Sequence, residues 1–319
     1  MISRRAALVG VALLAGMPAA RATTRMTLMV GTKPGTPLDG ICRAFAPFLA
    51  QRLDDTDIAV RNLPGESGLL ALETLAEAAP DGTAAGWISA PTLPARMVDH
   101  AADGLLDRLT LIGAIEREPI AFVSPVAAPL DSVQDIIRRA AEDADAVPIG
   151  TPAAGSPPHL AALRLQLLTR TRLNIVTFPS AAAARQAVIA GNVAAAALGL
   201  SDAIGALRDD KLAGIGIAAR TRAGMLPDLP VLNEAGVPLS ATIRRGLAVP
   251  ARVPEPTVQR LSQALRAIAA DPAFRAQADE TGFLATWIDG PAWTAQIRAE
   301  RQELAKLWAT EPWLHAGGG

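Results

Sequence analysis

The stretch Met26-Thr-Leu-Met-Val-Gly-Thr-Lys-Pro-Gly-Thr-Pro37 passes from a short apolar run into a turn rich in glycine and proline. The apolar run predicts a strand over 26–30, and the glycines and prolines predict a loop over 31–37. A helix is expected next, because the apolar residues that follow share one helical face. They are Leu38, Ile41, Phe45, Phe48, Leu49 and Leu53.

The same strand–loop–helix unit recurs along the chain, which predicts an α/β fold with parallel sheets and helices on both faces. The stretch 111–124 is expected to form two strands broken at Glu116–Pro119. We expect two lobes, 23–124 plus 244–319 and 125–243, joined by two crossings that leave a cleft between them. Ligand clefts occur preferentially at such interfaces and at the carboxyl ends of parallel strands. The further strands are expected at 58–61, 85–88, 147–150, 174–178, 193–198, 212–218 and 243–249, with a long helix at 291–309.

Composition narrows the class of protein. The chain has 319 residues, a length that fits two domains of ordinary size. Lys plus Arg is 30 and Asp plus Glu is 31, so no basic excess points to nucleic acid or an acidic membrane surface. Aromatic residues make up 3% and tyrosine is absent, which argues against a carbohydrate site built on aromatic platforms.

The residues that carry most catalytic and metal chemistry are scarce. The single cysteine, Cys42, excludes an internal disulfide framework and a cysteine-rich zinc site. The three histidines, His100, His159 and His315, lack metal-ligand spacing. We therefore expect no metal and no cofactor. No G-x-S-x-G nucleophile motif occurs, so an exported hydrolase is kept only as an alternative to a binding protein.

Residues 1–22 have the pattern of a signal peptide. Arg4 and Arg5 precede an uncharged apolar run, and Ala20-Arg21-Ala22 is a cleavage motif. The run is too short to span about 30 Å of hydrocarbon, which disfavours the alternative of a membrane anchor. We expect export to the periplasm, with cleavage after Ala22 and a possible twin-arginine route. The mature charge would be 27 − 31 = −4, since residues 1–22 hold three of the 30 basic residues and none of the 31 acids.

Four further stretches, taken together in this order and spacing, resemble the Bug-type extracytoplasmic solute receptors, the substrate-binding proteins of tripartite tricarboxylate transporters. The resemblance implies a two-lobed fold of the type II periplasmic-binding-protein kind, a small organic anion as ligand and membrane transporter subunits as partners. We expect a monomer, no nucleic-acid partner and no catalysis. The stretches are 31–39, 61–68 with Ala79-Pro-Asp-Gly-Thr83, Gly150-Thr-Pro-Ala-Ala-Gly-Ser-Pro-Pro-His-Leu160, and Leu226-Pro-Asp-Leu-Pro-Val-Leu-Asn-Glu-Ala-Gly236.

In that family the ligand carboxylate is held by the loop after the first strand and by the glycine–serine/threonine loop of the second lobe. Both loops here precede a helix, whose N-terminal N–H groups favour anions. The alternative is that these residues only form turns and helix caps. The residues expected to bind the ligand are Thr32, Lys33, Gly35, Thr36, Ser89, Gly155, Ser156 and Ser180. Those expected to brace the loops are Asp39, Asn62, Asp81 and His159.

The sequence departs from the family pattern in ways that leave the ligand unnamed. Lys33 replaces a small residue in the first loop and adds a cation there, either paired with the ligand or pointing to solvent. Pro37 removes a backbone donor. Ser180 lies in a stretch, 178–182, that lacks the family's tyrosine and lysine. Thr92 is a further possible cleft residue. A receptor that signals to a membrane sensor would use the same cleft and remains an alternative.

Overall fold

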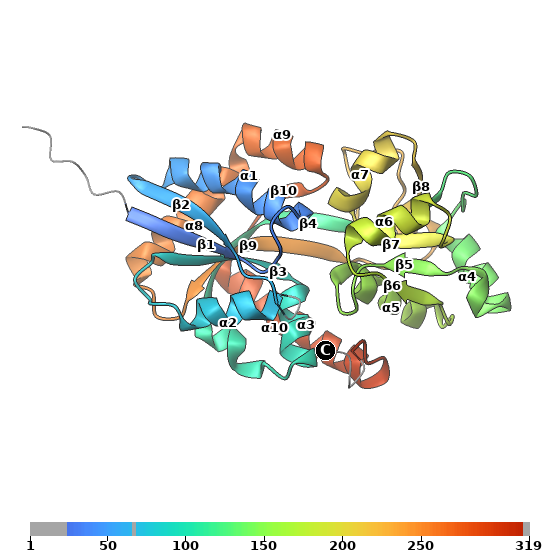
Figure 1. Ribbon diagram of the computed structural model, residues 1–319, viewed down its shortest axis with the longest axis horizontal. Coiled ribbons are helices and arrows are strands. Elements are labelled where there is room, and N and C mark those ends of the chain that lie inside the picture. Colours follow the sequence, from blue (N-terminus) through green and yellow to red (C-terminus); the bar gives the residue numbers. More distant parts are fainter. Residues whose placement is uncertain (1–23, 66–67, 315–319) are drawn as a thin grey trace, which may run out of the picture.

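The computed structural model describes residues 24–65 and 68–314 and has two lobes side by side (Figure 1). Each lobe is a sheet with helices on both faces, and strands β4 (Leu109–Pro125) and β9 (Thr242–Pro250) pass between the lobes. The expected two-lobed α/β fold is confirmed. The signal peptide expected over 1–22 lies outside the described residues.

The first-lobe sheet has the strand order β2-β1-β3-β9-β4-β10. β3 is parallel to β1 and antiparallel to β9, and β9 is antiparallel to β4. The carboxyl ends of β1 and β3 therefore point along β4, toward the second lobe. The remaining strands of this sheet are β1 (Thr24–Val30), β2 (Thr56–Asn62), β3 (Ala84–Ala90) and β10 (Leu284–Asp289).

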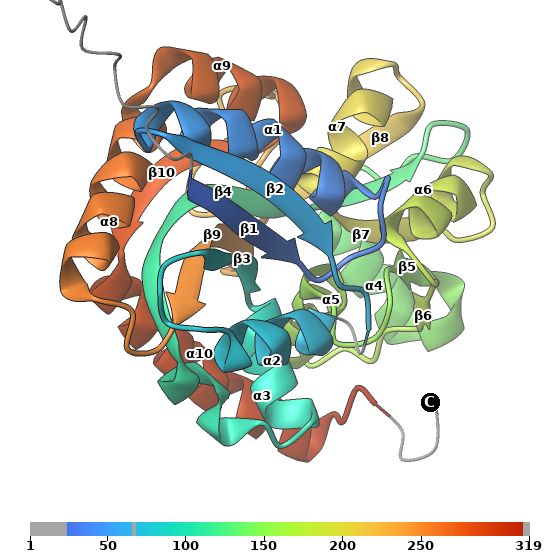
Figure 2. The ribbon, with the colours of Figure 1, turned by 60° about the vertical axis from the view of Figure 1, so that its left-hand side comes forward.

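Helices cover the two faces of this sheet, as Figure 2 shows. Leu28, Phe45 and Leu265 belong to the core under α1, α8 and α9, and Leu75 and Trp293 to the core under α2, α3 and α10. The helices are α1 (Pro37–Arg52), α2 (Leu69–Glu77), α3 (Thr92–Asp99), α8 (Glu255–Ala270), α9 (Pro272–Thr281) and α10 (Gly290–Thr310), with a 3₁₀ turn η2 (Asp103–Arg108).

The second-lobe sheet has the order β6-β5-β7-β4-β8. β5 and β7 are parallel to each other and β7 is antiparallel to β4, so their carboxyl ends point back toward the first lobe. Its strands are β5 (Ile149–Thr151), β6 (Ile175–Thr177), β7 (Ala195–Gly199) and β8 (Leu212–Ala218). Its helices are α4 (Val133–Glu142), α5 (Pro157–Thr169), α6 (Ala181–Ile189) and α7 (Leu200–Arg208), with 3₁₀ turns η3 (Ala144–Ala146) and η4 (Leu232–Ala235).

Strand β4 corrects one sequence expectation. It is a single strand of 17 residues rather than two strands broken at Glu116–Pro119. Two bulges bend it, and Pro119 lies where the partner changes: residues 109–119 pair with β9, and residues from Ile120 onward pair with β7 and β8. Bulges and a proline are compatible with such a bent strand. The two glutamates are buried against an arginine, so charge does not mark a loop here.

Several elements were not expected from the sequence, namely α3, α7, α9 and β10. The end of α10 and the segment after it reach the second lobe, where Leu307 of α10 and Trp313 share a core with Leu160 and Leu163 of α5. Glu311 in that segment also accepts a hydrogen bond from Gln166 at 3.0 Å. The C-terminal segment is thus a further tie between the lobes.

The close approach of β9 to β4 yields a stability prediction. A Cβ on Gly246 of β9 would collide with the backbone of Gly113 and Ala114. We expect Gly246→Ala to lower the free energy of unfolding by about 2–3 kcal/mol, because backbone on both sides has little room to move. Urea unfolding followed by tryptophan fluorescence measures this. Gly205→Ala is the control, since its Cβ meets nothing within 4 Å in the middle of α7. Equal stability of the two variants would contradict the prediction.

Candidate ligand-binding site

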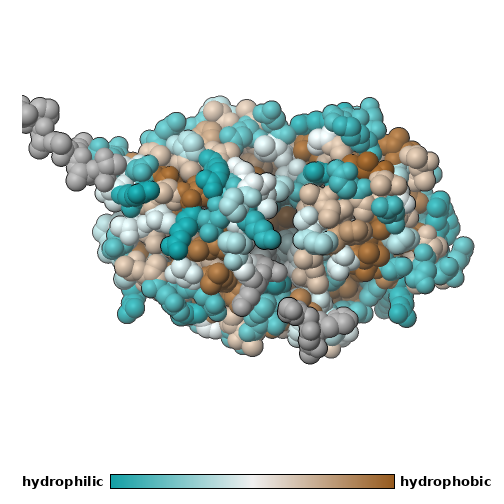
Figure 3. Space-filling view, viewed as in Figure 1, coloured by the Kyte–Doolittle hydropathy of each residue, from teal (hydrophilic) through white to brown (hydrophobic). Residues whose placement is uncertain are grey.

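A furrow runs between the lobes in the space-filling view (Figure 3). The strand directions explain its position, because the carboxyl ends of β1 and β3 face those of β5 and β7 across the junction. The loops over 31–36 and 152–156 follow β1 and β5 directly. The topology therefore brings the two expected ligand loops to the junction from opposite sides.

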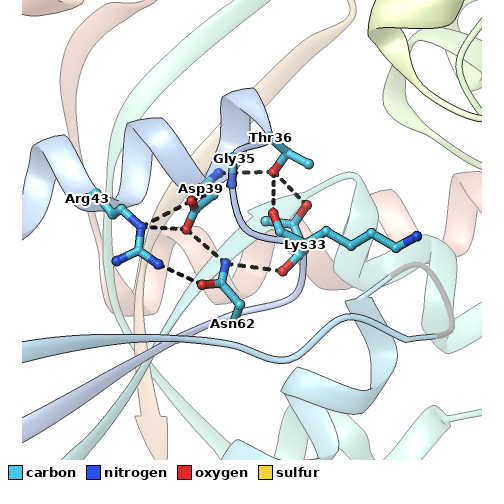
Figure 4. A network of polar contacts seen from close by, with 7 residues as sticks. Lys33, Gly35, Thr36, Asp39, Arg43 and Asn62 are labelled. Carbon is cyan, nitrogen blue, oxygen red and sulfur yellow. Dashed lines mark hydrogen bonds and ion pairs between the residues drawn. The ribbon is translucent and has the colours of Figure 1, made fainter.

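The first loop is organised around the carboxylate of Asp39 (Figure 4). Its oxygens accept hydrogen bonds from Gly35 N at 2.9 Å, Asn62 Nδ2 at 2.8 Å and Arg43 Nε at 3.1 Å. Asn62 Nδ2 also donates to the Thr32 carbonyl at 3.2 Å. Burial acts to raise the pKa of Asp39, but the bonds from Arg43, Asn62 and Gly35 hold the pKa below its ordinary value. Asp39 is therefore an ionised carboxylate that holds the loop in place through these hydrogen bonds, and Arg43 offsets its charge.

Thr36 caps α1 by accepting from Asp39 N at 3.4 Å. Its hydroxyl lies 2.8 Å from the Thr32 hydroxyl and donates to the Lys33 carbonyl at 2.9 Å. The backbone N–H groups of Lys33 and Thr36 make no hydrogen bond within the described part of the chain. The exposed Lys33 side chain extends away from this network (Figure 4). The free donors of the loop are thus at positions 33 and 36 rather than at Gly35.

The second loop repeats this construction. Gly155 has φ +71°, matching +79° at Gly35. Ser156 caps α5 by accepting from His159 N at 3.4 Å, and Gly155 N donates to His159 Nδ1 at 3.3 Å. Burial lowers the pKa of His159 to about 4, so the ring is neutral at physiological pH and Nδ1 can accept. The two loops share one design, with an anionic brace in one lobe and a neutral brace in the other.

Gly155 is buried against the first lobe. A Cβ there would collide with Arg96 Nη2 of α3 and lie 2.8 Å from Trp313 Nε1. Arg96 pairs with Asp99, which also accepts from Trp313 Nε1 at 2.7 Å, and all of these groups are buried. In this arrangement of the lobes Gly155 serves as a contact between them. Its expected role in ligand binding stays a prediction.

The carboxyl end of β3 supplies the next part of the site. Ser89 and Thr92 line a small cavity of about 80 Å³ together with Gly31. That volume has room for a few water molecules or one small polar group. Ser89 lies directly opposite Arg245 of β9 in the sheet register. The cavity therefore adjoins the place where the two lobes are connected.

A buried group of charges occupies that connection. Arg245 bonds Glu118 and lies 3.5 Å from Glu116, and Glu118 accepts at 2.8 Å from both the backbone and the hydroxyl of Ser201. Both glutamates are fully buried. Burial raises the pKa of Glu116 to about 7, and burial together with Glu118 raises the pKa of Asp202 to about 7. Glu116 Oε1 and Asp202 Oδ1 are buried and have no hydrogen-bond partner in the described part of the chain.

The two remaining expected residues differ in position: Ser180 follows the carboxyl end of β6, which is parallel to β5, and Asp81 precedes β3. Ser180 caps α6 by accepting from Ala183 N at 3.1 Å. Asp81 accepts from Thr83 N at 2.9 Å in the turn before β3, at the end of the sheet opposite the furrow, where the Thr83 bonds lower its pKa. The sheet thus separates Asp81 from the other expected bracing residues of the first lobe.

A hollow of about 1110 Å³ lies elsewhere on the described surface. It runs along α5 and the C-terminal segment, where Leu163, Leu167, Arg170 and Trp313 line it. It reaches only the back of the second loop, at Ala154 and His159. Because none of its lining residues belongs to the first loop or to β3, we place the ligand site in the furrow.

Burial raises the pKa of the Cys42 thiol, which disfavours the reactive thiolate. Within residues 24–65 and 68–314, no three His, Cys, Asp or Glu side chains are grouped to hold a metal ion. In the same residues, no helix combines the length and apolar character needed to cross a bilayer.

Sequence reasoning missed several residues of the site. Arg43 could have been found, because it lies four residues after Asp39 on the same helix. Glu116 and Glu118 alternate within an apolar run, which is the spacing of one strand face. Arg96 and Trp313 carried no local signal, since their contact with Gly155 depends on the tertiary fold.

A two-lobed α/β fold with loops converging on an interlobe furrow is the architecture seen in solved solute-binding proteins, among them one of the TctC family from Polaromonas (TM-score 0.73, 22% identity, covering 90% of this chain and 98% of that one). The family model of the tripartite tricarboxylate transporter family receptor matches residues 41–304. The chain therefore belongs to this family of periplasmic solute-binding proteins, and the resemblance drawn from the sequence is confirmed.

Individual relatives agree with this assignment. A UPF0065 protein of Bordetella bronchiseptica is 25% identical over 316 residues, covering 97% of this chain and 93% of that one. A Rhodopseudomonas palustris protein solved with adipate matches with a TM-score of 0.81 and 22% identity, covering 90% of this chain and 97% of that one. MatC from the same organism, solved with bound malate, matches with a TM-score of 0.76 and 23% identity, covering 89% of this chain and 98% of that one.

The first-loop network predicts a specific effect of Asp39→Asn. The variant should lose about 1–3 kcal/mol of stability, because an amide cannot accept from Gly35, Asn62 and Arg43 as a carboxylate does. In the wild type, the stability that ionised Asp39 contributes should be lost as the pH falls below about 4, because the pKa of Asp39 is lower in the folded chain than in the unfolded chain. Urea unfolding at pH 7 and pH 3.5 measures both effects. Asp81→Asn, a turn carboxylate at the far end of the sheet, is the control, and equal losses in both variants would contradict the assignment.

The buried acids predict how stability depends on pH. Between about pH 4 and 7 the unfolded chain releases protons that Asp202 and Glu116 keep, so the free energy of unfolding should fall as the pH rises. Asp202→Asn should reduce this fall by on the order of 2 kcal/mol. Urea unfolding at several pH values between 4.5 and 7.5 tests it, with the exposed Asp228→Asn as control. An unchanged slope in Asp202→Asn would count against a raised pKa at this position.

Proposed function

We propose that the furrow captures a small organic carboxylate and that the protein delivers it to the membrane subunits of a tripartite tricarboxylate-type transporter. One observation carries the proposal. Two loops of the same design, each ending in a capped helix N-terminus, meet at the junction from opposite lobes. Helix N-termini attract anions through their free N–H groups and partial positive charge.

The donors of the first loop suit a carboxylate. The N–H groups of Lys33 and Thr36 have no hydrogen-bond partner among residues 24–65 and 68–314, and the Lys33 ammonium adds a positive charge. The negative charge of Asp39 is offset by Arg43, and its carboxylate points toward Gly35, Arg43 and Asn62. Ser89 and Thr92 add hydroxyls at the end of β3. Ser156 and Ser180 would supply hydroxyls from the second lobe.

The related structures support the same ligand class. The Rhodopseudomonas palustris proteins of this fold were solved with adipate and with malate, both small dicarboxylates. A ligand held by both loops would favour the closed arrangement, because only that arrangement satisfies both of its ends. A sensor that passes the signal to a membrane partner would use the same site. A pull-down with solubilised membranes separates the two roles.

The proposed ligand class can be tested by thermal unfolding of the purified protein with malate, succinate, adipate and citrate. A ligand at about 100 times its Kd adds roughly 2.7 kcal/mol, which raises the midpoint by several degrees for a chain of this size. The fully amidated, neutral forms of the same acids should give no rise. A rise with these amides, or none with any acid in ligand-free protein, would count against carboxylate capture.

Lys33→Ala tests the direct ion pair. With an acid that raises the midpoint, we expect the variant to bind about tenfold or more weakly by calorimetry, since a charge-assisted hydrogen bond contributes about 1.5–3 kcal/mol. Arg25→Ala is the matched control, because Arg25 is an exposed cation at the opposite end of β1. Unchanged affinity in Lys33→Ala would show that Lys33 points to solvent and that the backbone donors act without it.

A further inference from the structure

A second hollow lies at the connection of the lobes and is lined by both of them. Its volume is about 410 Å³, at the lower end of the range for small-molecule sites. The two crossing strands contribute Arg117, Thr242 and Arg244, and the second lobe contributes Arg220, Thr221 and Ser240. Among the described residues, none of those that line it is acidic.

This hollow is separate from the furrow site. Arg117 alternates along β4 with Glu116 and Glu118, and Arg244 precedes Arg245 along β9. Successive side chains of a strand point to opposite faces. The hollow, which we call the rear pocket, therefore lies on the face of the β4–β9 pair opposite the buried charges and Ser89.

The rear pocket has uncompensated positive charge. Arg117 and Arg244 are direct cross-strand partners, and like charges in that position repel. Glu300 pairs with Arg244 through Nη2, but Arg244 Nε is buried and has no hydrogen-bond partner among the residues that the structure describes. The side chains of Arg117 and Arg220 make no ion pair or hydrogen bond with the described residues. The fold thus holds three guanidinium groups around one hollow with a single carboxylate among them.

We propose that the rear pocket binds a small oxyanion with at least two negative charges, such as phosphate or a tricarboxylate. The guanidinium group matches carboxylate and phosphate oxygens alike through paired N–H donors. The hydroxyls of Thr221, Ser240 and Thr242 provide further donors around the same hollow. Because its lining comes from both lobes, an anion bound there bridges them behind the furrow.

Calorimetric titration with inorganic phosphate and with citrate tests the proposal, at an ionic strength held constant with sodium chloride. The test variant is Arg117→Gln combined with Arg220→Gln, both exposed residues whose replacement leaves the core intact. The matched control is Arg222→Gln. Arg222 is an exposed arginine two positions after Arg220, and it pairs with Glu234 outside the pocket. The wild type should bind one anion at this site, and the double variant should bind at least tenfold more weakly. Arg222→Gln should bind as the wild type does.

Lys33→Ala separates this site from the furrow. Binding lost in the Arg117/Arg220 variant and retained in Lys33→Ala assigns the anion to the rear pocket, whatever becomes of carboxylate capture in the furrow. Binding that is equal in the wild type and the double variant would overturn the proposal. So would the absence of heat with both phosphate and citrate. Unchanged urea midpoints verify that the double variant is folded.

Discussion

The contact between Arg245 and the two glutamates of β4 is the constraint on which the rest of the molecule depends. It lies where the chain crosses between the lobes, and all three side chains are buried. Removing one partner of such a pair leaves an uncompensated buried charge, which costs about 3–5 kcal/mol. Glu118 also binds the first turn of α7 through Ser201. The contact therefore sets β4, β9 and a second-lobe helix in one fixed relation, and the spacing of the two ligand loops follows from it.

The two loops solve the same local problem with different charges. In each, a glycine with positive φ donates its N–H to the side chain four residues later, and a threonine or serine between them caps the helix. The acceptor is Asp39 in one lobe and His159 in the other. A protonated His159 could not accept from Gly155, so its low pKa is a structural requirement. Arg43 has no counterpart in the second loop because a neutral brace needs no counterion.

The local parts of this architecture could be predicted from the sequence, and the tertiary contacts could not. Glycine, cap residue and proline at 35–37 and 155–157 are signals within a few residues, and both loops lie at helix starts as expected. From the sequence, the crossing reads as a break, because Glu116, Glu118 and Pro119 are poor strand residues. Only the fold places Arg245, 129 positions after Glu116, beside the two glutamates. The burial of Gly155 under Arg96 and Trp313 depends in the same way on distant segments.

The contacts around the crossing also define how the lobes can separate. On one side, α5 shares a buried core with α3, α10 and Trp313. On another side, the exposed Arg208 of α7 donates to the carbonyls of Asp279 and Glu280 near the end of α9, at 3.1 and 2.9 Å. Replacing exposed polar contacts of this kind by contacts with water costs little free energy. Separating the apolar core costs the whole free energy that its burial provides. We therefore expect opening to preserve the α5 core and to part α7 from α9, with the lobes turning about a line through the β4–β9 crossing and that core.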